Sequence, residues 1–233
     1  MKSSTNFSMS VASKIYQFKY DRHYRRQLHW QKDSPTVLIH APKTGGMSIS
    51  GALGYKKDTG HFTFAEHLDS KRVPVERVIV AVRDPIDRLK SLFKYSRKKS
   101  QGSLLAPLRP LRRFDSLQSF VHSTMFQTFI NEHYFFKPQY HFAQGVFNTD
   151  LPVFFLRTEH LSSDAKRAGL DNVEQLNKSP KMEDDIVGLD EESLEIVRRA
   201  YEVDELYLDR VRDIIRDDLE KRSAAGRAEK EVL

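Results

Sequence analysis

The chain of 233 residues contains no cysteine, which excludes a disulfide framework and any metal site built on thiolates. No apolar run approaches the roughly 20 residues that a membrane-spanning helix needs. The first residues, MKSSTNFSMSVASKIYQF, lack the continuous apolar core of a secretory signal. From these absences we expect a soluble, cytoplasmic protein without a membrane span.

Positive charge is in modest excess, because the chain contains 38 Lys and Arg residues and 32 Asp and Glu residues, which gives a net charge of +6. A positive chain favours anionic partners, and nucleic acid, acidic polysaccharide and phosphorylated cofactors all fit that description. Apolar residues make up 39% of the chain, enough for a sizeable core. Composition therefore favours an anion-binding globular protein without choosing the anion.

Three short apolar runs rich in β-branched residues are expected to form buried strands. They are TVLIH at 36–40, RVIVAV at 77–82 and PVFFLR at 152–157. Apolar residues at helical spacing follow the second run and recur over 116–131. Strands that alternate with helices predict an α/β fold with a mainly parallel sheet.

The chain divides into three predicted parts. Residues 1–34 form a basic helix or arm, 35–222 a single α/β domain, and 223–233 a frayed tail. Within the domain, the basic stretch 98–115 contains a glycine and two prolines and is expected to be a surface loop. The region from Asp190 onward is helical in pattern and rich in acid–base pairs.

The stretch VLIHAPKTGGMSIS, 37–50, places a lysine before two glycines, between a predicted strand and a predicted helix. The common nucleotide loop, G-x-x-x-x-G-K-[ST], has its lysine after the glycines. Glycines let backbone N–H groups approach an anion, Lys43 adds a positive charge, and Thr44 and Ser48 add hydroxyls. A plain strand-to-helix turn is the alternative.

A second candidate anion site follows the second strand. Arg83 stands where the strand is expected to end, and Ser91 lies about two helical turns further on. Both could face one anion beyond the carboxyl end of the sheet, where ligands of such folds bind. Alternatively, Arg83 pairs only with Asp87 or Glu159, and Ser91 is an ordinary helix residue.

Together, PKTGGMS at 42–48 and RDPIDRLKSLF at 83–93 resemble two motifs of sulfotransferases that use 3′-phosphoadenosine 5′-phosphosulfate (PAPS). These are the 5′-phosphosulfate loop and the 3′-phosphate motif. The likeness is to the carbohydrate group, both uronyl 2-O-like and sulfotransferase family 2-like, with patterns PKTGGTS and R-[DN]-P-x-x-R-x-x-S. LRTEHLSSD, LNKSP and AYEVDELYLDRV resemble later, weaker motifs of the family.

The resemblance implies a P-loop-like parallel sheet between helices, in three layers. It implies PAPS as cofactor, adenosine 3′,5′-bisphosphate as product, no metal, and a hydroxylated, acidic carbohydrate as acceptor. Met47 departs from the pattern, because threonine or serine is usual there. The implied cofactor contacts are Lys43, Thr44, Gly45, Gly46, Met47, Ser48, Arg83, Ser91, Lys178 and Ser179.

The resemblance implies catalytic roles for Lys43 and His61. Lys43 would neutralise the bridging oxygen of the breaking bond. His61, in TGHFTFAEH, resembles the second histidine of the H-G-H-V stretch in uronyl 2-O-sulfotransferases and would be the general base. Glu66 and His67 are nearby substitutes, and Glu159 is expected to be a structural partner of Arg83 or the loop.

The acceptor side is less recognisable. The family signature H-x-x-P-Q is altered in HYFFKPQYHFAQG, from which we expect acceptor contacts at His133, Gln139 and His141. The basic stretch 96–113 could steer an acidic acceptor or could simply be a solvated face.

Three rival interpretations stay open. One is a non-catalytic module that binds polyanions or nucleic acid through the basic arm and 96–113. A divergent nucleotide kinase is another, although it would need a magnesium-binding carboxylate where Arg83 stands. The third is a degenerate sulfotransferase fold that binds the cofactor product without chemistry, as Met47 allows.

Overall fold

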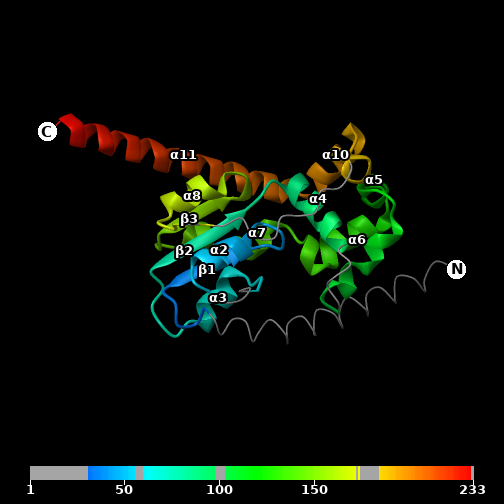
Figure 1. The fold of residues 1–233 in the computed structure, drawn as a ribbon, viewed down its shortest axis with the longest axis horizontal. Helices are drawn as coiled ribbons and strands as arrows, with labels where there is room; N and C mark the ends of the chain where they lie inside the picture. The colour runs from blue at the N-terminus through cyan, green and yellow to red at the C-terminus, as the bar shows by residue number, and fades with distance from the viewer. Residues whose placement is uncertain (1–30, 56–59, 98–102, 172, 174–183, 232–233) are drawn as a thin grey trace.

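A computed structural model describes residues 31–55, 60–97, 103–171, 173 and 184–231. Its centre is a parallel sheet in the order β1-β2-β3 (Figure 1). The strands are β1 at Thr36–His40, β2 at Arg77–Val82 and β3 at Val153–Arg157. The three predicted strands and the α/β class are confirmed.

Helices cover both faces of this sheet (Figure 1). Val37, Ile39, Val78 and Val80 pack toward the helices α3 (Phe64–Ser70), α7 (Gln139–Ala143) and α11 (Glu202–Glu231). Leu38 and Ile79 alternate with them and pack toward α2 (Gly46–Ala52) and α8 (Leu161–Arg167). Because both faces are buried, the strands read as continuous apolar runs.

A second apolar cluster lies beside the sheet and is built from helices alone. Phe93, Phe120, Phe126 and Phe136 are fully buried at its centre and contact one another ring to ring. Its elements are α4 (Pro85–Ser96), η2 (Ser103–Arg113), α5 (Leu117–Val121), α6 (Thr124–Glu132), η3 (Tyr134–Phe136), α9 (Asp184–Val187) and α10 (Glu191–Ala200). Two further short turns are η4 (Val146–Asn148) and η5 (Thr158–His160).

The structure differs in detail from the prediction in two segments, 98–115 and 116–131. The predicted surface loop 98–115 contains the 3-10 helix η2, whose Leu108 and Leu111 are fully buried. These two residues are three apart and therefore share one face of a 3-10 helix. The predicted helix 116–131 is interrupted after Val121, because Ser123 is extended and caps a new helix.

The chain ends on the long helix α11, which runs out past the sheet (Figure 1). Residues 1–30 of the predicted arm lie outside the described residues. Gln31 lies against the domain, where its side-chain Oε1 accepts a hydrogen bond from Leu38 N on edge strand β1 at 3.0 Å. No helix in the described parts of the chain has the length and apolar character to cross a bilayer. The domain limits 35–222 and the frayed tail stay predictions.

Candidate anion-binding site

The loop after β1 contains two residues in left-handed backbone conformations. Lys43 has a φ of 72° and Gly45 a φ of 84°. Gly45 caps α2 without a side-chain hydrogen bond. The first N–H groups of a helix have no partner within it, so this loop brings a positively charged side chain and backbone donors to one place.

The second glycine of the loop has a steric role that the sequence did not suggest. A Cβ on Gly46 would lie 2.1 Å from Nδ1 and 2.4 Å from Cε1 of His40. The His40 ring, 2% exposed, therefore occupies the space that any other residue at 46 would need.

The side chains of the loop differ in what they offer a ligand. Thr44 is fully buried, and its Oγ1 donates to Ala41 O at 2.9 Å, so this hydroxyl shapes the loop. Thr158 Oγ1, at the start of η5 just after β3, lies 2.9 Å from Thr44 O and 3.0 Å from Val82 O of β2, so it connects the loop to the end of the sheet. Ser48 is 4% exposed, whereas Met47 is 38% exposed at the start of α2.

Arg83 at the end of β2 lies directly against this loop. Its Nη1 donates to Lys43 O at 3.2 Å, while its buried Nε has no hydrogen-bond partner among the described residues. Burial lowers the pKa of Arg83, although the nearby Asp87 and Glu159 raise it. A half-buried guanidinium that lacks full hydrogen bonding is suited to receive an anion.

Helix α4 brings the remaining cofactor candidates to the same place. Lys43 Nζ lies 4.4 Å from the ring centroid of Tyr95. Ser91, one turn earlier on α4, is 3% exposed. Arg83 and the Lys43 loop, 40 residues apart in the sequence, thus meet at the carboxyl edge of the sheet. Anion binding by these motifs stays a prediction. Lys178 and Ser179 lie outside the described residues.

The backbone of Arg83 and that of the next residue, Asp84, are each held by a side chain from later in the chain. Gln139 Oε1 accepts from Arg83 N at 2.9 Å, and Gln139 Nε2 donates to Arg83 O at 2.8 Å. Glu159 Oε1 accepts from Asp84 N at 2.8 Å, next to the cap of α4. Glu159 therefore contributes a structural contact, in line with its expected role.

A buried arginine that the sequence analysis missed connects the loop to the acceptor segment. Arg88 is fully buried, and its Nε donates to Pro42 O at 3.2 Å. Its Nη2 donates to Phe135 O at 3.1 Å and Lys137 O at 2.6 Å. The second arginine of R-D-P-x-x-R was the available signal.

Asp204 of α11 completes this network. Its Oδ2 lies 3.6 Å from Arg88 Nη1, and its carboxylate accepts from Gln139 N at 2.8 Å and Tyr140 N at 2.9 Å. Burial raises the pKa of Asp204, whereas Arg88 and the two backbone donors lower it. We take the carboxylate as ionised, since every group that it contacts is a donor.

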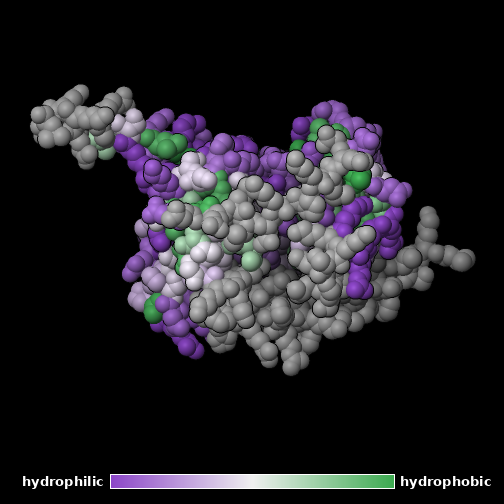
Figure 2. Space-filling view, viewed as in Figure 1, coloured by the Kyte–Doolittle hydropathy of each residue, from purple (hydrophilic) through white to green (hydrophobic). Residues whose placement is uncertain are grey.

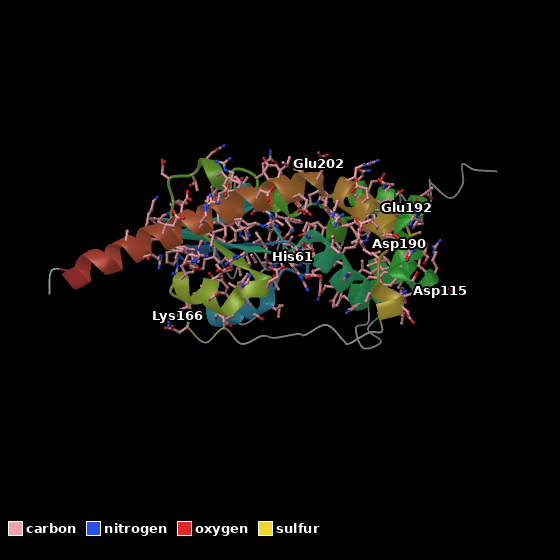
Figure 3. The ribbon with its side chains drawn as sticks, turned by 90° about the horizontal axis from the view of Figure 1, so that it is seen from above. His61, Asp115, Lys166, Asp190, Glu192 and Glu202 are labelled. Atoms are coloured by element: carbon pink, nitrogen blue, oxygen red, sulfur yellow. The ribbon has the colours of Figure 1, made fainter. Side chains whose placement is uncertain are left out.

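His61 lies beside the loop, against His40 at the end of β1. His61 Nδ1 is 3.0 Å from His40 O and 3.1 Å from His40 Nδ1. The rings meet edge to face, with centroids 4.5 Å apart. Tyr134 OH donates to His61 O and so connects the acceptor segment to this histidine. Figure 3 shows His61 near the middle of the molecule.

The two substitutes for His61 have other environments. Glu66 Oε2 accepts from Thr63 N and Thr63 Oγ1, both at 2.8 Å, in the capping box of α3. This T-x-x-E pattern was the signal for a helix that the sequence analysis did not predict. His67 is fully buried, neither ring nitrogen has a hydrogen-bond partner among the residues that the structure describes, and burial lowers its pKa to about 3. A base that weak is poorly suited to proton abstraction.

The expected acceptor residues lie in one segment, but two are buried. His133, 7% exposed, stacks on Phe129 at 4.6 Å and accepts from Phe135 N. Gln139 is 2% exposed and engaged with Arg83, as described above. His141 is half-buried, and its Nε2 is 3.5 Å from Lys137 Nζ; burial lowers its pKa. Acceptor contact by these residues stays a prediction.

A shallow pocket of about 340 Å³ lies away from these residues, between the end of β3 and α11. Its three arginines are already ion-paired with acidic neighbours: Arg157 with Asp164, Arg212 with Asp209, and Arg216 with Asp213. Figure 2 shows hydrophilic side chains interspersed with smaller apolar patches over the visible coloured surface. This pocket contains no predicted site residue and offers little unpaired charge to a polyanion.

Comparison with protein-family models, curated proteins and solved structures finds no match to this chain.

Proposed function

We propose that this protein transfers a sulfuryl group from PAPS to a hydroxyl of an acidic carbohydrate. The observation that carries the proposal is the convergence of Arg83 and the Lys43 loop at one edge of the sheet. The cofactor is anionic at both ends of its ribose, so it needs two cradles that lie close together. Arg83, with its unpartnered Nε, fits the 3′-phosphate, and the loop fits the 5′-phosphosulfate.

Each residue has a role in this proposal. The N–H groups at the start of α2 would bind the phosphosulfate, and Lys43 would neutralise the leaving oxygen. In the proposed reaction, the acceptor oxygen would form a bond to sulfur while the bond between sulfur and the phosphate oxygen breaks. The electron pair of the broken bond would leave with adenosine 3′,5′-bisphosphate, and the hydroxyl proton of the acceptor would pass to His61. His61 would act as general base. The proposal requires no metal.

The test is calorimetric titration with adenosine 3′,5′-bisphosphate, against ATP and AMP. Wild type should bind the bisphosphate selectively, and both Arg83→Ala and Lys43→Ala should weaken binding about 10-fold or more, because each removes a charge-assisted contact. Arg109→Ala and Arg113→Ala are matched controls, since both arginines are exposed on η2.

The outcomes separate the rival functions. Loss of affinity in the η2 variants but not in Arg83→Ala, with a steep salt dependence, would support the polyanion-binding module instead. Preference for ATP with magnesium would support the kinase. Selective bisphosphate binding without turnover on any glycan acceptor with labelled PAPS would indicate the non-catalytic fold that Met47 left open.

A further inference from the structure

His40 belongs to no motif of the sequence analysis, yet it is the residue most closely associated with His61. It is the last residue of β1 and is 2% exposed. Two of its atoms, the carbonyl O and ring Nδ1, lie within 3.1 Å of one atom of His61, Nδ1. Such a double contact constrains both the orientation of the His61 ring and the position of its proton.

The position of that proton follows from the carbonyl. A carbonyl oxygen only accepts hydrogen bonds, so His61 Nδ1 must donate to His40 O and must carry the proton. His40 Nδ1, on the other side of the same donor, must then be the unprotonated nitrogen of a neutral ring. The neutral His61 ring consequently has its lone pair on Nε2, which is therefore the basic nitrogen of the ring.

The His40 ring is fixed on its other side as well. Gly46 leaves room for it, because a Cβ there would lie 2.1 Å from His40 Nδ1. His61 is in turn held through its own carbonyl by Tyr134, and its ring lies 6.5 Å from that of Phe135, centroid to centroid. The pair is therefore packed between the loop and the acceptor segment.

We propose that His40 is a positioning residue for His61: its carbonyl and Nδ1 together accept the Nδ1–H of His61, fix that tautomer, and leave Nε2 as the basic atom. This inference rests on the proposed function for its chemistry. The tautomer itself is a property of the free protein, however, and is measurable without any ligand.

The first experiment reads that tautomer directly. Protein labelled with ¹⁵N in the imidazole rings gives two-bond ¹H–¹⁵N correlations that distinguish a protonated from an unprotonated ring nitrogen. The His61→Ala variant assigns the signal, and spectra are taken at a pH where the ring is neutral. We expect the proton on Nδ1; a proton on Nε2 in wild type would overturn the inference.

The second experiment separates positioning from a merely structural role. His40→Leu removes the accepting nitrogen, whereas His40→Asn places an amide oxygen where Nδ1 lies. We expect His40→Leu to lower kcat for sulfuryl transfer about 10-fold with KM for PAPS unchanged, and His40→Asn to restore most of the loss. His122→Asn is the control, because His122 bonds to Ser193 far from the loop.

The two proposals fail in different ways. If the bisphosphate does not bind, the sulfotransferase function fails, while the His61 tautomer still decides whether His40 positions the ring. If the bisphosphate binds and depends on Arg83, but kcat of His40→Leu equals that of wild type, only the positioning role is rejected. A His40→Leu variant that does not fold leaves the wild-type spectrum as the deciding measurement.

Discussion

Gly45 and Gly46 are adjacent in the loop but meet different steric demands. Gly45 has a left-handed backbone, which glycine adopts without the strain that a side chain brings. Gly46 needs no unusual φ; it needs the absence of a side chain, because His40 fills that space. The sequence suggested one purpose for both, the approach of the backbone to an anion.

This difference predicts the behaviour of Gly46→Ala. The new methyl group would collide with the His40 ring, which cannot retreat from the sheet end, so we expect a stability loss of about 1–3 kcal/mol. Urea unfolding measures it. The double variant Gly46→Ala/His40→Ala should recover part of the loss, and Gly51→Ala, exposed on the same helix, should be neutral or stabilising. An unchanged midpoint for Gly46→Ala would contradict the packing argument.

Residues with a chemical signature were predictable, and residues with a supporting role were not. Lys43 and Arg83 stand out in the sequence as candidates, because a charge beside glycines or at a strand end favours an anion contact, and their binding of an anion stays a prediction. His40, Arg88 and Asp204 are single polar residues in apolar or helical patterns. Their importance lies in partners distant in the sequence, which no local pattern encodes.

At the scale of elements, the sequence predicted those with strong local signals. The three strands are runs of β-branched residues, and α4 begins with two strong local signals, Asp84 as cap and Pro85 in the first turn. The helix η2 was not predicted, because glycine and proline suggested a loop while tertiary packing buried Leu108 and Leu111. Tertiary contacts outweighed local propensity there.

The junction between α7 and the end of β2 predicts the effect of Gln139→Leu. The side-chain amide of Gln139 pairs with the backbone N–H and C=O groups of Arg83, and a leucine would leave these two groups without that partner. We expect a stability loss of about 1–3 kcal/mol and weaker binding of adenosine 3′,5′-bisphosphate, measured by urea unfolding and calorimetry. Gln144→Leu, at the exposed end of the same helix, is the control. Full bisphosphate affinity in Gln139→Leu would show that Arg83 does not depend on this contact.

At the scale of the whole molecule, the burial of the His67 ring predicts how the free energy of unfolding depends on pH. Its pKa falls from an ordinary 6.5 to about 3 on folding, so between these values the unfolded chain binds the additional proton. Stability should therefore decrease as pH falls below 6.5, and this group should contribute about 2 kcal/mol of loss between pH 7 and pH 5.

Urea unfolding of wild type and His67→Leu at the two pH values measures that contribution. The variant should lose about 2 kcal/mol less than wild type on acidification, and at pH 7 it should be near neutral because His67 has no hydrogen-bond partner to lose. Parallel curves for wild type and His67→Leu would mean that His67 is not buried in its neutral form.

The Arg88–Asp204 contact also determines when the site can form during synthesis. Pro42 of the loop is held by Arg88, whose buried ion-pair partner, Asp204, belongs to α11, the last helix of the described residues. A ribosome-bound chain that lacks α11 would leave Arg88 buried without its counter-charge and Gln139 without its second anchor. All three strands of the sheet precede α11 in the sequence and can pair before it is made, whereas the ligand loop must wait for α11. Binding competence should therefore arrive only once α11 has been synthesised and has docked on the sheet.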